Sequence, residues 1–171
     1  MTNRPLKEEY NPYYEQYIRL VREEDIIEVL ADAQESTDAL LAELTEEQGN
    51  YRYADGKWSL KEVIGHVADG ERIMSYRLLR ASRGDKTPLA GFDQDEFMTS
   101  APFASWTMEQ IREEYVSVRR ATLSLLRGLT EDAWTRSGIA NGSNVSARAL
   151  AYIIAGHELH HLRIIKERYL R

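Results

Sequence analysis

The chain has 171 residues, of which 43% are hydrophobic, so it is long enough for one domain with a substantial core. Its 22 basic and 28 acidic side chains give a net charge of −6, which argues against binding to the phosphates of nucleic acid. There is no cysteine, which excludes disulfides and thiolate ligands and is compatible with a reducing cytoplasm. The N-terminus lacks the apolar core of a signal peptide, and no apolar run approaches the roughly 18 residues of a membrane span. We therefore expect a single cytoplasmic domain, residues 1–171, that binds neither nucleic acid nor membranes.

Four segments show the apolar periodicity of amphipathic helices. Ser59 with Glu62 forms a capping box at the start of the second segment, Thr107 with Gln110 does the same for the third, and Ser146 is placed to cap the fourth. The predicted helices cover residues 25–46, 60–82, 107–128 and about 147–169. No segment alternates convincingly between apolar and polar residues, so we expect negligible sheet. The pattern predicts an all-α, four-helix bundle.

The connection between the second and third predicted helices, residues 84–106, is unusually long for a compact domain. It contains Pro88, Gly91 and Pro102, together with four large aromatic side chains, which are Phe92, Phe97, Phe103 and Trp106. Connections of this length are usually lids, binding segments or crossovers, and the aromatic residues indicate that this one is packed. We expect a long crossover loop here. The tyrosine-rich segment 1–22 is predicted to pack on the bundle.

Three of the four histidines lie within five residues of each other near the C-terminus. His157 and His161 are one helical turn apart, so their two imidazoles can bind one divalent ion. His66 is on the inward face of the second predicted helix and supplies a third ligand if the second and fourth helices are neighbours. His160 points away from the face of the other two. We predict a metal site formed by His66, His157 and His161; the alternative is a hydrogen-bonded core histidine at position 66 and a partly exposed C-terminal cluster.

The run 157–161 also matches the short zinc-protease motif, in which a glutamate, here Glu158, activates water. The extended motif requires Gly at position 164 and His at position 167, where this chain has Ile164 and Glu167. The protease interpretation therefore lacks its third ligand. Glu158 and Asp69, the latter about one turn from the upstream histidine, remain candidate catalytic carboxylates, although a solvated helix carboxylate is an equally good interpretation of Glu158.

Three glycines accompany the predicted ligands. Gly65 and Gly156 directly precede His66 and His157, and Gly70 lies one turn beyond His66. A glycine inside a helix costs about 1 kcal/mol relative to alanine, so these positions need a reason. We expect a close approach of neighbouring elements or room for a ligand.

Three motifs resemble the DinB-like (YfiT-like) family of metalloenzymes. They are Trp58-Ser-Leu-Lys-Glu-Val-Ile-Gly-His-Val-Ala-Asp-Gly-Glu-Arg72, Arg83-Gly-Asp-Lys-Thr-Pro-Leu-Ala-Gly-Phe-Asp93 and Ala151-Tyr-Ile-Ile-Ala-Gly-His-Glu-Leu-His-His-Leu-Arg-Ile-Ile165. The resemblance covers most of residues 25–170. It implies a four-helix bundle, a homodimer, and nickel or zinc bound by His66, His157 and His161.

The resemblance also bears on activity, because characterised relatives of this fold include transferases and isomerases that use low-molecular-weight thiols such as bacillithiol and mycothiol. By resemblance, the metal would bind and deprotonate the thiol, which then attacks an electrophilic small-molecule substrate. We therefore expect a divalent-metal-dependent enzyme of the S-transferase type. One alternative is a non-catalytic, stress-related bundle whose ion only ties two helices together. Another is a metal-dependent hydrolase with Glu158 or Asp69 as base.

Overall fold

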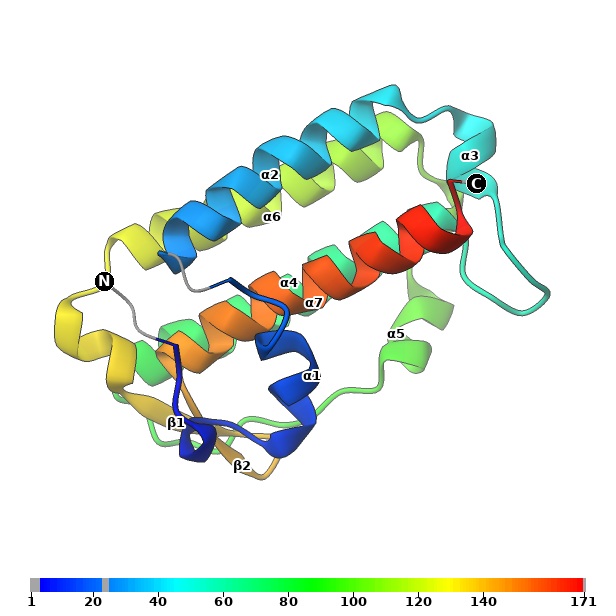
Figure 1. Cartoon of the computed structure of the whole chain (residues 1–171). Helices are drawn as coiled ribbons and strands as arrows, with labels where there is room; N and C mark the ends of the chain where they lie inside the picture. The colour runs from blue at the N-terminus through cyan, green and yellow to red at the C-terminus, as the bar shows by residue number, and fades with distance from the viewer. Residues whose placement is uncertain (1–3, 23–24, 171) are drawn as a thin grey trace.

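Four long helices form a bundle in the computed structural model, which describes residues 4–22 and 25–170 (Figure 1). They are α2 (Ile26–Glu43), α4 (Leu60–Ser82), α6 (Met108–Arg127) and α7 (Ala147–Arg168). Helix α2 packs on α6, α6 on α4, α4 on α7, and α7 on α2, so the order around the bundle differs from the order along the chain. Figure 1 shows α2 and α7 running in one direction and α4 and α6 in the other. The predicted all-α, four-helix bundle is confirmed.

The helix ends follow the polar residues that cap them. At the start of α4 the Ser59 side chain accepts a hydrogen bond from the Glu62 amide, and the Glu62 carboxylate accepts one from the Ser59 amide. The prediction of residues 60–82 is met at both ends. Helix α2 ends three residues earlier than predicted, because Thr45 forms a capping box with Gln48 and begins a separate short helix, α3 (Glu46–Asn50).

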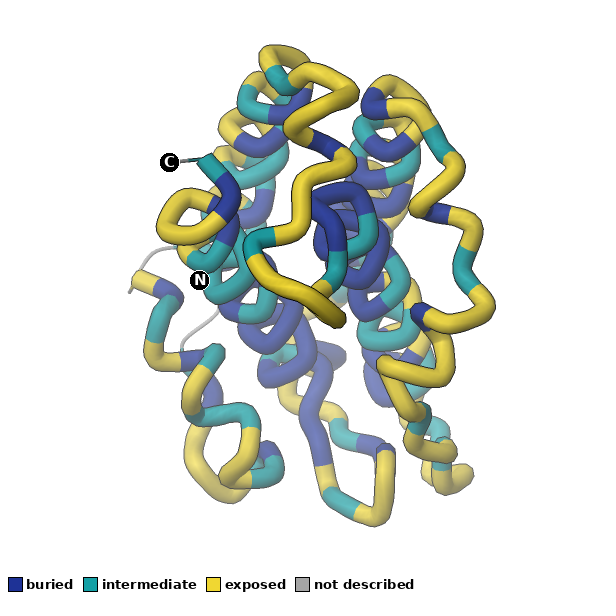
Figure 2. Tube along the Cα trace, turned by 90° about the vertical axis from the view of Figure 1, so that its right-hand side faces the viewer, coloured by how far each residue is buried: buried dark blue, intermediate teal, exposed yellow. Residues whose placement is uncertain are grey.

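The interior of the bundle contains two apolar clusters separated by polar side chains. One cluster includes Leu30, Leu78 and Ile153, and the other includes Leu41 and Ile111. The residues between them form what we call the polar layer, which consists of Thr37, Glu71, Tyr115, Arg119 and Glu158, all nearly inaccessible to solvent. Figure 2 shows the buried residues along the facing sides of the helices and the exposed ones mainly in the connections.

The N-terminal segment lies against α7. Its described part consists of two 3₁₀ turns, Lys7–Glu9 and Pro12–Tyr14, followed by helix α1 (Glu15–Ile18). Helix α1 contacts α7, and Ile18 is buried in the bundle core. The first three residues of the predicted segment 1–22 lie outside the described residues.

A two-stranded hairpin precedes α7, although negligible sheet was expected. Strands β1 (Ser137–Ala140) and β2 (Ser143–Ser146) are antiparallel, with Ala140 opposite Ser143. The turn between them is Asn141-Gly142, and both residues have positive φ, at 49° and 73°. Asn-Gly is the sequence preferred by tight hairpin turns of this kind, because these two residues tolerate positive φ. The expectation was wrong because the strands are too short to show alternation, whereas the turn was a usable signal.

The long connection between α4 and α6 contains regular structure. It carries helix α5 (Gln94–Ser100) and a 3₁₀ turn at Phe103–Ser105, and it runs back along the bundle in Figure 1. The side chain of Asp93 caps α5 by accepting hydrogen bonds from the backbone amides of Asp95 and Glu96. Of its aromatic residues, Phe103 is buried and Phe97 is exposed. The predicted loop is therefore partly a helix, and Asp93 was the signal for it.

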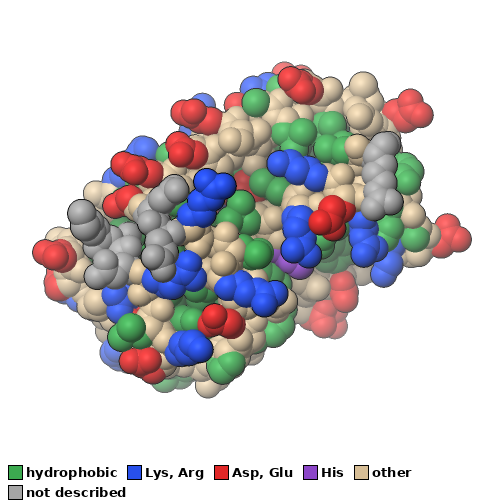
Figure 3. Space-filling view, viewed as in Figure 1, with side chains coloured by type: hydrophobic (Ala, Val, Ile, Leu, Met, Phe, Trp, Pro, Cys, Tyr) green, Lys and Arg blue, Asp and Glu red, His purple; other side chains and the backbone are tan. Residues whose placement is uncertain are grey.

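Charged side chains of both signs are spread over the outer surface. Figure 3 shows acidic and basic groups on one face, with a small histidine surface visible among them. Within the described ranges, none of the helices combines the length and hydropathy required to cross a membrane.

Candidate metal centre

The three predicted ligands converge where α4 meets α7. The Nε2 atom of His157 lies 3.1 Å from that of His66 and 3.1 Å from that of His161. Each of the three residues offers one ring nitrogen, and these atoms all lie within 4.8 Å of one another. Because α4 and α7 are neighbours, the condition set for His66 as third ligand is fulfilled. We call this group the three-histidine site.

All three imidazoles are held neutral. Burial lowers the pKa of His66 to about 4. Burial, together with the nearby charges of His66 and His160, lowers the pKa of His161 to about 3. Burial and the neighbouring histidines also hold the pKa of His157 well below its usual value. Each ring therefore has one unprotonated nitrogen at neutral pH, and three neutral imidazoles with ring nitrogens this close together are a donor set that divalent zinc or nickel accepts.

The three glycines leave room for close packing around the site. A Cβ atom at Gly156 would lie 2.1 Å from the backbone oxygen of Tyr17, so glycine is what allows α1 to rest directly on α7. A Cβ atom at Gly65 would lie 2.2 Å from the ring of Phe103, and one at Gly70 would lie 3.2 Å from Cε1 of His157. The expected close approach is thus observed at all three positions.

Aromatic rings enclose the histidines. The ring of Trp58 lies 5.0 Å from that of His66, and the ring of Tyr17 lies 5.4 Å from those of both His157 and His160. His160 is partly exposed, and its ring also contacts that of His161. These contacts restrict the rotation of the imidazoles and limit the access of water to them.

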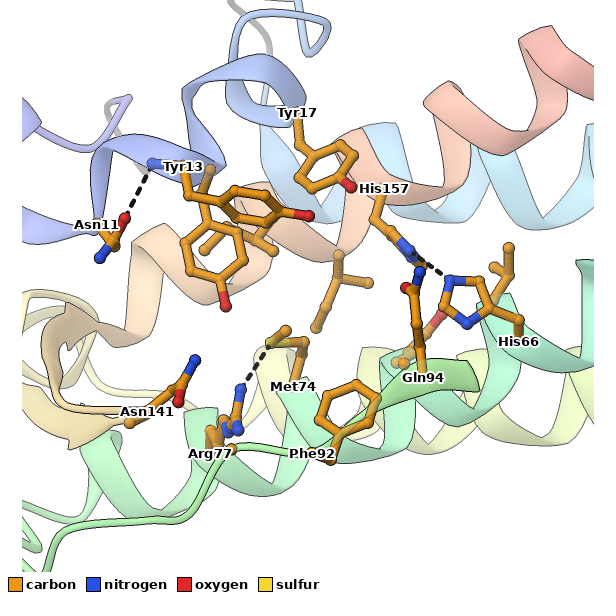
Figure 4. Close-up of a pocket in the computed structure, with 18 of the residues that line it drawn as sticks. Asn11, Tyr13, Tyr17, His66, Met74, Arg77, Phe92, Gln94, Asn141 and His157 are labelled. Carbon is orange, nitrogen blue, oxygen red and sulfur yellow. Dashed lines mark hydrogen bonds between the residues drawn. The ribbon is translucent and has the colours of Figure 1, made fainter. Parts of the chain in front are cut away.

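A cavity of about 470 Å³ opens directly beside the site. Its walls come from α1, α4, α7, the hairpin and the start of α5, and His66 and His157 form part of them. Figure 4 shows Tyr13 and Tyr17 above this cavity, Met74, Arg77 and Phe92 below it, and Gln94 reaching toward the paired histidines. We call it the main cavity because two of the three histidines line it, and its size is in the range that suits a small-molecule ligand.

A second cavity, of about 610 Å³, is lined by Asp95, Met98 and Thr99 of α5 and includes His161 in its wall. Asp95, at the start of α5, lines both cavities, and its negative charge partly opposes the lowering of the pKa of His66. The three-histidine site therefore lies between two openings, with α5 across it.

Glu158 lies in the polar layer and does not line either cavity. Its Oε1 accepts hydrogen bonds from Thr37 Oγ1 at 2.8 Å and from Tyr115 Oη at 2.5 Å, and its Oε2 accepts one from Arg119 Nη2 at 2.7 Å. The residue is 1% exposed. The structure thus places this predicted catalytic candidate in the interior of the bundle, where it links α7 to α2 and α6.

Asp69, the other predicted carboxylate, is also absent from both cavities. It lines a separate groove together with Glu114, and its Oδ1 lies 3.9 Å from Arg72 Nη1. Burial raises the pKa of Asp69, with Arg72 opposing this effect and Glu114 adding to it. Its placement gives it no direct access to the three-histidine site.

Four residues at the site were not predicted from the sequence, namely Tyr17, Trp58, Gln94 and Asp95. Tyr17 belongs to the tyrosine-rich segment 1–22, and Trp58 is the first residue of the motif that contains His66; neither pattern predicts a contact with the histidines. Gln94 and Asp95 follow the Asp93 cap within the long connection, and recognition of that cap would have identified a helix next to the site.

Comparisons with known proteins agree with this architecture. A curated relative from Oceanobacillus iheyensis is 28% identical over 148 residues, which is 84% of each chain, and another from Geobacillus thermodenitrificans is 31% identical over 147 residues, which is 82% of each. Both carry the name "putative metal-dependent hydrolase".

Solved structures show the same fold at lower identity. YfiT from Bacillus subtilis, described as having an unusual four-helix bundle topology, superposes with a TM-score of 0.68 at 18% identity, over 96% of this chain and 91% of that one. A mycothiol-dependent maleylpyruvate isomerase superposes with a TM-score of 0.68 at 15% identity, over 85% of this chain and 61% of that one. Residues 30–165 match the family model of the DinB superfamily, and with the 31% identical relative this shows that the chain belongs to the DinB superfamily.

Proposed function

We propose that this protein is a metal-dependent enzyme in which His66, His157 and His161 hold one divalent ion, nickel or zinc, and the main cavity holds a small-molecule substrate. The observation that carries this proposal is the convergence of three neutral imidazole nitrogens beside a 470 Å³ cavity that His66 and His157 line. An ion that only tied α4 to α7 would need the nitrogens but not the cavity. The names of the curated relatives point to metal dependence as well.

The reaction that we propose first is thiol transfer. A divalent ion at this site would supply Lewis acidity and favour the thiolate form of a low-molecular-weight thiol. The thiol sulfur then bonds to an electrophilic carbon of the substrate, the leaving group departs with the electrons of its bond, and the thiol proton passes to solvent. Tyr17 and Trp58 limit water at the histidines, and Gln94 offers an amide to orient the bound molecules. The structural neighbour that uses mycothiol supports this choice.

Hydrolysis is the second candidate reaction, and it is favoured by the position of Asp95 beside the three-histidine site. Asp95 lines both cavities, and in this mechanism its carboxylate accepts a proton from the attacking water molecule. Glu158 and Asp69 do not have this position. The names of the curated relatives also point to hydrolysis.

Metal content tests the site itself. Protein purified without an affinity tag is analysed by elemental mass spectrometry, alongside His66→Gln, His161→Gln and the neighbouring control His160→Gln. We expect near-stoichiometric nickel or zinc in the wild type and the control, and little in the other two variants, with circular dichroism confirming that all are folded. Folded wild type that takes up neither metal when both are offered would refute the proposal.

A cobalt-substituted sample separates the two reactions. Bacillithiol is added to the Co²⁺ protein, and the absorption spectrum is followed for a sulfur-to-cobalt charge-transfer band. Transfer of bacillithiol to monochlorobimane and hydrolysis of p-nitrophenyl acetate are then compared in the wild type and Asp95→Asn. If the reaction is thiol transfer, the charge-transfer band appears and Asp95→Asn still conjugates bacillithiol to the bimane. If the reaction is hydrolysis, no band appears and Asp95→Asn no longer cleaves the ester.

A further inference from the structure

A buried arginine at the far end of the main cavity lacks an ionic partner. Three lysine or arginine side chains are buried among the described residues, namely Lys61, Arg77 and Arg119. Lys61 pairs with Glu46, and Arg119 pairs with two glutamates of the polar layer. Arg77, which is 4% exposed, forms no ion pair with any residue that the structure describes. A buried charge without a counter-charge is costly, so this position needs an explanation.

The contacts of Arg77 leave much of its hydrogen-bonding capacity unused. Its Nη2 donates to the backbone oxygen of Ala90 at 2.7 Å, and its Nη1 lies 3.7 Å from the sulfur of Met74, a weak acceptor. The guanidinium lies 5.9 Å from the centre of the Phe92 ring, which gives partial compensation for the charge. A guanidinium has five N–H donors, and Figure 4 shows this one extending toward the main cavity.

None of the three carboxylates that line the main cavity pairs with Arg77. Glu71 accepts two hydrogen bonds from Arg119, and Asp93 accepts the amide hydrogen bonds that cap α5. Asp95 lies at the histidine end. Arg77 is therefore the only lysine or arginine among the described residues that line the cavity, and its charge has no carboxylate within ion-pair distance.

The spacing of residues along α4 gives the distance between the histidine end of the main cavity and its arginine end. Gly70, Met74 and Arg77 occupy one face of the helix, because steps of four and three residues return to the same side. Gly70 packs against His157, so it marks the level of the three-histidine site. Arg77 is seven residues further, or about 10 Å along the helix axis. Met74, between them, forms an apolar floor.

We propose that Arg77 binds a carboxylate of the small molecule that occupies the main cavity, at the end opposite the three-histidine site. The planar guanidinium can donate two parallel hydrogen bonds to a carboxylate, and Asn141, at the hairpin turn, lines the same cavity and offers an amide. The ligand class is therefore an elongated, monoanionic or dianionic molecule whose reacting group and carboxylate are separated by an apolar section. This assignment rests on the proposed function for the position of the reacting group.

A pair of matched thiols tests the assignment in the cobalt protein. 6-Mercaptohexanoate and 6-mercaptohexanol share the thiol and the chain and differ in the carboxylate, and their affinities are read from the change in the Co²⁺ spectrum. We expect the acid to bind about tenfold more tightly in the wild type, which corresponds to about 1.4 kcal/mol, because hydrogen bonds to charged groups are worth this much or more. The preference should vanish in Arg77→Gln and persist in Arg80→Gln, an arginine of the same helix that pairs with Asp85.

A second measurement needs no metal. Hexanoate and 1-hexanol, which lack a metal-binding group, are compared by thermal shift on the metal-free protein and on both variants, and hexanoate should stabilise the wild type and Arg80→Gln but not Arg77→Gln. If cobalt does not bind but the protein still prefers hexanoate to hexanol, the proposed metal-dependent function is refuted and the assignment of Arg77 as a carboxylate-binding residue is retained. Equal responses to acid and alcohol in the wild type, or a preference that survives in Arg77→Gln, would overturn the Arg77 assignment. If Arg77→Gln does not fold, Arg77→Lys replaces it, and a weakened preference is expected.

Discussion

Replacement of Glu158 distinguishes a structural role from a catalytic one. The polar layer holds Arg119 between Glu71 and Glu158, so it contains one positive and two negative charges if all are ionised. Burial and the adjacent Glu158 carboxylate raise the pKa of Tyr115, which therefore stays a hydrogen-bond donor at neutral pH. The Glu158 carboxylate thus accepts hydrogen bonds from Thr37, Tyr115 and Arg119, and a substitution at Glu158 affects all three donors at once.

The two substitutions Glu158→Gln and Glu158→Ala differ in what they leave behind. Glutamine keeps the volume and removes a surplus negative charge, while Arg119 retains two hydrogen bonds to Glu71, at 2.8 and 2.7 Å. We expect this variant to lose about 1–2 kcal/mol of unfolding free energy, from charged hydrogen bonds that become neutral. Alanine leaves the hydroxyls of Thr37 and Tyr115 without their acceptor in a buried gap, and we expect a loss of about 3–5 kcal/mol.

Urea denaturation followed by circular dichroism measures these free energies. The cobalt spectrum reports whether the three-histidine site still binds metal, and bimane conjugation or ester cleavage reports whether it still turns over substrate. The structural role predicts that Glu158→Gln keeps its cobalt spectrum and its turnover within a few-fold. Glu167→Gln, an exposed glutamate of α7 that pairs with Arg163 at 3.4 Å, is the control and should change stability by less than about 0.5 kcal/mol. Wild-type stability in Glu158→Gln combined with abolished turnover would show that Glu158 acts on the substrate and would refute the reasoning.

Three further predictions concern residues around the site. The pKa of Asp69 is raised in the folded state, so its contribution to stability is fully present below its unfolded pKa and is lost as the pH rises through its folded pKa. Asparagine mimics the protonated carboxyl at every pH. Urea midpoints should therefore show that Asp69→Asn is more stable than the wild type at pH 7 but not at pH 3. Gly156→Ala should cost about 1–3 kcal/mol in the same assay, because its Cβ would meet the backbone of Tyr17; no loss would mean that α1 does not rest on α7. Gly70→Ala should fold normally but shift His157, which would appear as weaker Co²⁺ affinity in a competition titration.

The bundle was predictable because its signals are local. The capping box of Ser59 and Glu62 fixed the start of α4, and the spacing of His157 and His161 placed both imidazoles on one face of α7. Helix α5 was missed because a helix of seven residues is too short for its periodicity to be recognised, and only the Asp93 cap announces it. The main cavity depends on where this connection packs, which no local pattern specifies.

The role of Glu158 could not be inferred from α7 alone. Arg119 stands beside Arg120 in the sequence, a pair that resembles a solvated surface, yet Arg119 lies in the same stripe of α6 as Tyr115 and Thr122 and is buried. A charged residue at a position whose helical neighbours are all buried is a usable signal for an internal ion pair. Its partners come from two other helices, so their identity requires the three-dimensional arrangement.

The polar layer is connected to the three-histidine site through α7, which carries both Glu158 and His157. Glu158 directly follows His157, and a rotation of α7 by one residue step, about 100°, would break its contacts and turn His157 away from His66. We infer that the layer selects the rotation in which the three imidazoles converge. A quintuple variant, Thr37→Val, Glu71→Leu, Tyr115→Phe, Arg119→Met and Glu158→Leu, removes the charges together with the two hydroxyls that donate to Glu158, and it should keep most of its stability, since buried ion pairs are often replaceable by apolar residues. It should nevertheless bind Co²⁺ more weakly than the wild type, and an unchanged affinity would show that apolar packing alone fixes the rotation of α7.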